Sequence, residues 1–105
     1  MLIDESFDLG RQSYTLTRIH HLDGHVLRVE VKRDFYGFQS YATVAVLTPQ
    51  QTWTVLASTP PDGWHDRTPT KATHAGCLSP IADGLVARGQ RILAITSPDT
   101  DTATS

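Results

Sequence analysis

The chain has 105 residues, of which 39% are apolar and 19% charged, and a formal net charge of −2. This length suits one domain with a single modest hydrophobic core. The slightly acidic balance argues against a broad phosphate-binding surface, because domains that bind nucleic acid through their charge usually carry a basic excess. The composition therefore predicts one globular domain and disfavours general nucleic-acid binding.

The cysteine content and the N-terminal segment favour a cytoplasmic location. Cys77 is the single cysteine, so no intramolecular disulfide can form. The first ten residues, MLIDESFDLG, are acidic and lack the charged-then-apolar order of a signal peptide. No apolar run approaches the roughly 20 residues that a bilayer requires. We expect a cytoplasmic protein without membrane association and without a cofactor.

The N-terminal segment is acidic but not wholly polar. Asp4, Glu5 and Asp8 alternate irregularly with Phe7 and Leu9. Such a segment can add an edge strand to a sheet or bind a partner, and the sequence does not decide between these two roles.

Strand character recurs between residues 12 and 58. Within residues 25–33, apolar Leu27, Val29 and Val31 alternate with polar residues, which is typical of a half-buried antiparallel strand. An Asp-Gly pair before this segment is a strong hairpin signal. Strands joined by short turns usually pair in sequence order, so we predict a four-stranded antiparallel meander. The four predicted strands are residues 12–21, 25–33, 39–48 and 52–58.

The segment 60–76, PPDGWHDRTPTKATHAG, differs in composition from the strands before it. It holds three prolines and two glycines and almost no aliphatic residues, so we predict neither a strand nor a helix. It is longer than a routine connection, and long ordered loops in compact domains often carry function. The alternative is that this loop is a flexible connection without a function of its own.

An amphipathic helix is predicted over residues 79–96. Ser79 and Pro80 suit a helix start, and apolar residues then recur at spacings of three and four. Gly84 and Gly89 each cost about 1 kcal/mol relative to alanine in a helix interior. An alternative therefore ends the helix at Gly89 and makes residues 91–96 a fifth strand, but the unbroken apolar spacing favours one helix. We expect this helix to bury Leu85, Val86, Ile92 and Leu93 against Leu27, Val29, Val31, Val44, Val46 and Val55.

These elements predict an α+β fold of two layers, in which the helix packs on the apolar face of the four-stranded antiparallel sheet. Residues 1–96 form one domain, and residues 97–105 are a polar tail that we expect to be disordered. The other sheet face carries Arg28, Glu30 and Lys32. That face must be polar, be covered by the loop, or be paired with a second copy.

Aromatic residues cluster before the third predicted strand. Tyr36-Gly37-Phe38 partly resembles the aromatic motif of RNA-recognition domains, whose rings stack on bases. However, Asp34-Phe35 replaces the basic-glycine pair of that motif, so we do not assign the chain to that family. The rings are interpreted as hairpin-corner packing or, alternatively, as a contact for a partner.

Histidines and the cysteine suggest sites that the sequence supports only weakly. His20, His21 and His25 flank the Asp-Gly turn, and His74-x-x-Cys77 has a spacing found among zinc ligands. Structural zinc sites usually have two such ligand pairs and only one is present here, so we predict no metal site. His65, Asp66, His74 and Cys77 offer the parts of a small hydrolase or thiol enzyme.

The sequence favours a non-catalytic interaction module that associates with itself or with a protein partner. The expected contact residues are Tyr36, Phe38, Trp64, Arg67, Arg28 and Lys32. The first alternative is the small enzyme that uses residues 62–77. The second is a weak nucleic-acid-binding domain that uses the arginine-bearing face with Tyr36 and Phe38.

Overall fold

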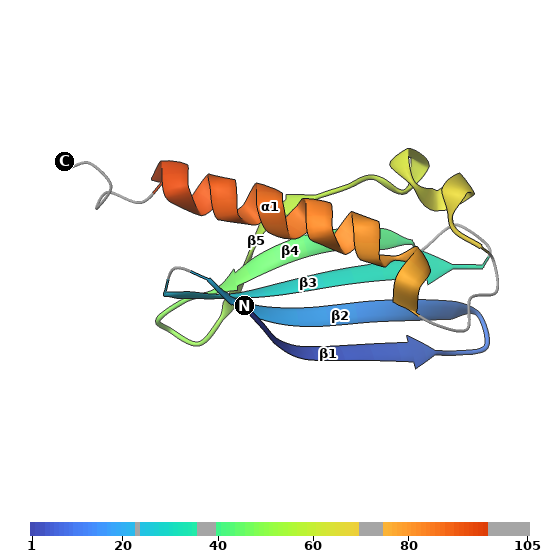
Figure 1. Ribbon diagram of the computed structural model, residues 1–105, viewed down its shortest axis with the longest axis horizontal. Coiled ribbons are helices and arrows are strands. Elements are labelled where there is room, and N and C mark those ends of the chain that lie inside the picture. Colours follow the sequence, from blue (N-terminus) through green and yellow to red (C-terminus); the bar gives the residue numbers. More distant parts are fainter. Residues whose placement is uncertain (23, 36–39, 70–74, 97–105) are drawn as a thin grey trace.

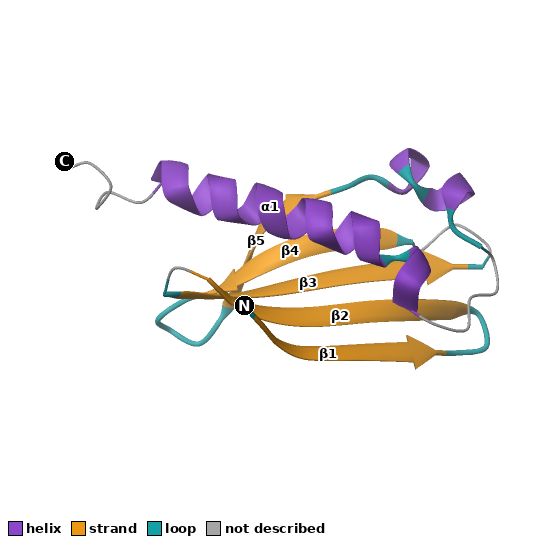
Figure 2. Cartoon of the chain, in the orientation of Figure 1, coloured by secondary structure: helices purple, strands orange, loops and turns teal. Residues whose placement is uncertain are grey.

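The computed structural model describes residues 1–22, 24–35, 40–69 and 75–96, and these form a sheet and one long helix in two layers (Figure 1). The helix lies along one side of the sheet, and short three-ten turns cluster near its N-terminal end (Figure 2). The strands are β1 (Leu2–Leu9), β2 (Ser13–Leu22), β3 (His25–Asp34), β4 (Tyr41–Leu47) and β5 (Trp53–Ser58). The helical elements are η1 (Pro61–Gly63), η2 (His65–Arg67), η3 (Ala75–Cys77) and α1 (Ser79–Thr96).

The sheet is an antiparallel meander with the strand order β1-β2-β3-β4-β5. The α+β class and the single C-terminal helix are confirmed, but the predicted number of four strands is wrong. The fifth strand is β1, the acidic N-terminal segment. It pairs with β2, places Phe7 opposite Leu16, and sets Glu5 2.6 Å from the Arg18 guanidinium. Its exposed residues give β1 little of the apolar alternation that identifies the inner strands.

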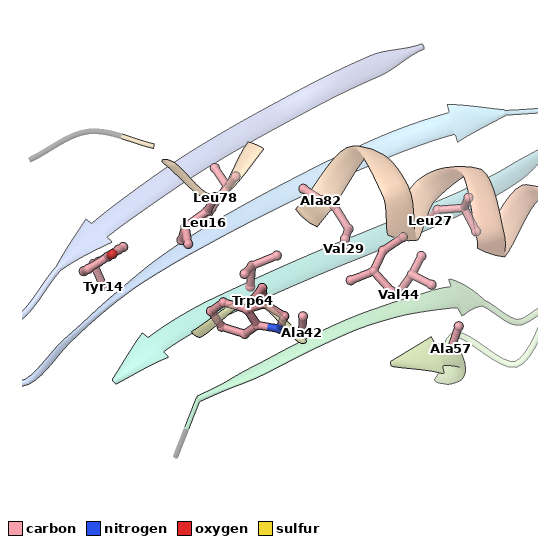
Figure 3. Close-up of a cluster of buried hydrophobic side chains, with 12 residues drawn as sticks. Tyr14, Leu16, Leu27, Val29, Ala42, Val44, Ala57, Trp64, Leu78 and Ala82 are labelled. Atoms are coloured by element: carbon pink, nitrogen blue, oxygen red, sulfur yellow. The ribbon is translucent and has the colours of Figure 1, made fainter. Parts of the chain in front are cut away.

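The hydrophobic core lies between α1 and the facing side of the sheet. The side chains of Leu27, Val29 and Val31 are fully buried, as their alternation predicts. Figure 3 shows that strands, helix and loop all contribute to this cluster. Burying side chains of this size contributes about 1.5–3 kcal/mol each, so the core is the main source of stability. The other buried apolar members are Tyr14, Leu16, Ala42, Val44, Ala57, Trp64, Leu78, Ala82 and Leu85.

The helix α1 runs unbroken over the predicted residues and packs over β3, β4 and β5. The alternative fifth strand over residues 91–96 is therefore wrong. Gly89 is buried inside this helix because the backbone passes close to β4. A Cβ at this position would lie 3.2 and 3.3 Å from the two methyl groups of Val44. The glycine allows a close approach that offsets its poor helix propensity.

The predicted burial of Val55 under the helix is wrong, because 61% of this side chain is exposed. The register between β4 and β5 shifts after Val44, which pairs with Ala57, whereas Ala45 pairs with Val55. Such a bulge inserts an extra residue and reverses the alternation beyond it. Val55 therefore points to the sheet face opposite the helix.

The loop after β5 contains short helical turns, which corrects the prediction that residues 60–76 hold no helix. The elements η1 and η2 occupy its first half, and η3 leads into α1. Trp64 lies between η1 and η2, is 1% exposed, and donates its indole N–H to the Thr59 carbonyl at 3.5 Å. This ring anchors the loop to the core on the helix side of the sheet.

Candidate interaction surface

The sheet face opposite α1 carries exposed apolar and aromatic side chains, among them Val55 and Tyr41. Within the described residues, α1 and the three-ten turns pack on the other side of the sheet. Strand register assigns each side chain to a face, because directly paired residues point the same way. We call this surface the open face. It comprises Asp4, Ser6, Asp8, Thr15, Thr17, Ile19, His21, Val26, Arg28, Glu30, Lys32, Tyr41, Thr43, Ala45, Leu47, Trp53 and Val55.

Two aromatic rings on the open face lie close to cationic side chains of β3. The Arg28 guanidinium carbon lies 4.5 Å from the centroid of the Trp53 ring. The Lys32 Nζ lies 6.0 Å from the centroid of the Tyr41 ring. Each arrangement fits a cation–π contact, which stabilises a partly exposed pair by roughly 0.5–1 kcal/mol. These contacts favour the positions that the two rings have on this face.

The open face carries charges of both signs. Glu30 lies between Arg28 and Lys32 on β3, and Asp4 and Asp8 lie on β1. Burial raises the pKa of Tyr41, and the charge of Glu30 and a hydrogen bond to it raise this pKa further. The Tyr41 hydroxyl is therefore neutral at physiological pH. The mixed charges make the face unsuited to a continuous run of phosphates.

The structure distributes the predicted partner contacts over two sides of the molecule. Arg28 and Lys32 lie on the open face. Trp64 is buried in the core, so it is not available to a partner, and Arg67 is exposed on the helix side. Tyr36 and Phe38 lie outside the described residues.

Sequence reasoning missed three prominent side chains of the open face. Val55 and Tyr41 are 61% and 37% exposed, and Trp53 is half-buried beneath Arg28. Aromatic and β-branched residues in 52–58 were a visible signal of a strand. The bulge that turns Val55 outward has no marker in the sequence, so the face of this residue was not predictable.

The predicted base, His65, is tied into a network around a buried arginine. Arg33 is 5% exposed, and its Nη1 lies 2.5 Å from the His65 Nε2 and 2.5 Å from the Asp34 carbonyl oxygen. Its Nε donates to Thr68 Oγ1 at 2.9 Å. The His65 Nε2 also lies 3.2 Å from the Asp34 carbonyl oxygen. It accepts in the tautomer that pairs with the guanidinium, which only donates, and it donates in the tautomer that pairs with the carbonyl. His65 therefore fastens the loop to the end of β3. Asp66, with a fully exposed carboxylate, lies 3.9 Å from the His65 Nδ1.

The predicted nucleophile, Cys77, is half-buried near a core tyrosine. Its Sγ lies 3.8 Å from the Tyr14 hydroxyl, which donates to the Pro69 carbonyl oxygen. Burial, together with the contact to Cys77, raises the pKa of Tyr14 to about 12, so the phenol stays protonated. His74 lies outside the described residues. In the described part of the chain, no three histidine, cysteine, aspartate or glutamate side chains converge to hold a metal ion.

Comparison with known proteins assigns no family. No family model, no curated protein and no solved structure matches the chain. Among the described residues, no helix is both long enough and apolar enough to cross a membrane. The surface chemistry of the fold is therefore the basis for a functional proposal.

Proposed function

We propose that this protein is a non-catalytic interaction module that forms a dimer through its open face. The observation that supports this function is the exposure of Val55 and Tyr41 on a sheet face whose other side is closed by α1. Aromatic and aliphatic side chains that stay exposed on an ordered sheet are the anchors that protein interfaces use. Lys32 lies beside the Tyr41 ring, and Arg28 lies beside the half-buried Trp53 ring of the same face.

The size of the open face suits a dimer. Five strands spaced about 4.8 Å apart, each contributing roughly 25 Å of length, give a footprint of about 600 Å². Standard interfaces bury about 800 Å² per partner, so a stacked pair of sheets with its rim contacts reaches this class. Stacked sheets lie about 10 Å apart, a distance that side chains of this size fill.

A second copy of the chain is the partner that we propose for the open face. A two-fold interface places the same surface on both subunits. When the axis runs along the strands, β1 of one copy lies over β5 of the other. In this arrangement β3 of one copy lies over β3 of the other, so Arg28, Glu30 and Lys32 each come near their own copies. The exposed apolar and aromatic side chains of the open face, rather than its charges, therefore support self-association.

The free edge of β1 is a less suitable interface. Its exposed backbone groups can pair with another strand, but Asp4, Glu5 and Asp8 bring like charges together when two copies of β1 meet. Acidic residues on an edge strand are a common protection against such pairing. We therefore assign self-association to the face rather than to this edge.

Sedimentation velocity over a concentration series tests the proposal. We expect the wild-type protein to shift from monomer to dimer in the micromolar range and Val55→Asp to remain monomeric. Leu9→Asp is the matched control, because Leu9 is 54% exposed and also lies in an edge strand, but on the helix side of the sheet. A monomeric wild type at several hundred micromolar contradicts the proposal. Loss of the dimer in Leu9→Asp alone assigns the interface to β1 instead.

A further inference from the structure

A concave site lies on the helix side of the sheet, away from the open face. A pocket of about 400 Å³ opens between the loop after β5 and the first half of α1. This volume falls in the lower part of the range of small-molecule sites, about 300–1,000 Å³. The loop is held in place by Trp64 and by the Arg33 network, so the pocket is built from anchored elements.

The walls of this pocket are mainly apolar. Trp64 and Leu85, each 1% exposed, belong both to its lining and to the hydrophobic core. Half-buried Cys77 and Ile81 add further apolar surface. Gly84 also lines the pocket, and a Cβ added there would meet no atom within 4 Å. A ligand with an apolar body of moderate size can therefore pack against these side chains.

Two arginines lie in the lining of the same pocket. Arg88 donates through Nη1 to the Ser58 carbonyl at 3.2 Å, and Arg67 donates through Nη2 to the Gly63 carbonyl. A guanidinium has five N–H donors, so each arginine is positioned by the backbone while further donors remain for a ligand. The described lining contains no carboxylate that would neutralise these charges. The pocket is therefore cationic at its polar positions.

We propose that this pocket binds a small organic carboxylate with an aliphatic body. Arginine pairs with carboxylates through parallel, charge-assisted hydrogen bonds, which fix the head group. The hydrocarbon body lies against Ile81, Cys77 and Leu85 and is removed from water, which supplies the apolar part of the affinity. This site is independent of the open face, so its test and the test of dimerisation have separate outcomes.

Isothermal titration calorimetry with octanoate, supported by tryptophan fluorescence, tests this proposal. We expect one octanoate per chain, with octan-1-ol binding at least 10-fold more weakly because it lacks the charge. Arg88→Gln and Arg67→Gln should each weaken octanoate binding by about 5-fold or more. Arg91→Gln is the matched control, because Arg91 is an exposed arginine of the same helix outside this pocket. It should bind octanoate like the wild type.

A variant that fills the pocket separates binding inside it from binding elsewhere. Gly84→Phe adds a ring at a lining position where a Cβ meets no atom within 4 Å, and it should abolish octanoate binding while the circular dichroism spectrum stays unchanged. The proposal is overturned if the wild type shows no saturable binding of octanoate. It is also overturned if Arg88→Gln, Arg67→Gln and Gly84→Phe all bind as the wild type does.

Discussion

Substituting alanine for the two helix glycines should have opposite consequences for stability. Gly84 is exposed, and a Cβ added to it would meet no atom within 4 Å, whereas Gly89 faces β4. Gly84→Ala should raise the free energy of unfolding by about 1 kcal/mol, the difference in helix propensity. In a domain of this size, about 1 kcal/mol corresponds to roughly 4–8 °C in Tm.

Gly89→Ala gains the same propensity but meets Val44. Its Cβ would lie 3.2 and 3.3 Å from the two Val44 methyl carbons and 3.5 Å from the Leu56 Cδ1. Favourable carbon–carbon contacts are about 3.5–4.0 Å, so the helix or the strand must shift by a few tenths of an ångström. Overpacking of this kind costs about 1–3 kcal/mol. We expect Gly89→Ala to be at least about 1 kcal/mol less stable than Gly84→Ala.

Urea unfolding followed by circular dichroism measures both variants, alone and in a Val44→Ala background. Val44→Ala removes the two methyl groups, so Gly89→Ala should regain about 1 kcal/mol there, while Gly84→Ala should be unaffected by the background. Equal stabilisation by the two alanines, with no coupling to Val44, would refute the inferred close packing of α1 on β4.

Three further outcomes follow from the buried polar groups and the anchored loop. Arg33→Ala should lower the free energy of unfolding by about 2–3 kcal/mol, because several hydrogen-bond acceptors lose a charged donor. Arg11 is exposed, so Arg11→Ala should change the free energy of unfolding by less than about 0.5 kcal/mol. Urea titrations compare the two variants. Burial lowers the pKa of His20 below 6.5, so the unfolded chain binds its proton more readily, and stability should fall as the pH drops below about 6.5. His20→Gln should flatten that decline in urea titrations at several pH values, and an unchanged slope would exclude His20 as its source. Trp64→Ala should cost about 3–5 kcal/mol in thermal unfolding, and a loss below about 1 kcal/mol would show that the ring does not anchor the loop.

The hairpins and the helix were predictable because their apolar periods are long and regular. Leu27, Val29 and Val31 repeat every second residue, and α1 repeats every third or fourth through Gly89. The sequence does not identify β1 as a strand, because its residues are mostly exposed and carry little alternation. The shift of register after Val44 depends on backbone geometry across two strands, so the outward position of Val55 needed the structure.

The candidate surfaces were predictable only where a side chain lies within a regular strand. Alternation along β3 correctly assigns Arg28 and Lys32 to the face opposite the helix. Trp64 lies in an irregular loop, where no period indicates burial, and its aromatic character fits a core residue as well as an interface residue. The pocket at Arg88 lies between the helix and a loop that is distant from Arg88 in sequence. No short stretch of sequence indicates that these two segments lie side by side.

The role of the open face is tested most directly by recording amide NMR spectra during dilution. We predict concentration-dependent shifts at Ile19, Arg28, Tyr41 and Val55, with those of α1 residues such as Ala87 unchanged. Shifts confined to α1 or to β1, or spectra that stay the same from millimolar to low micromolar protein, would contradict a dimer formed through this face.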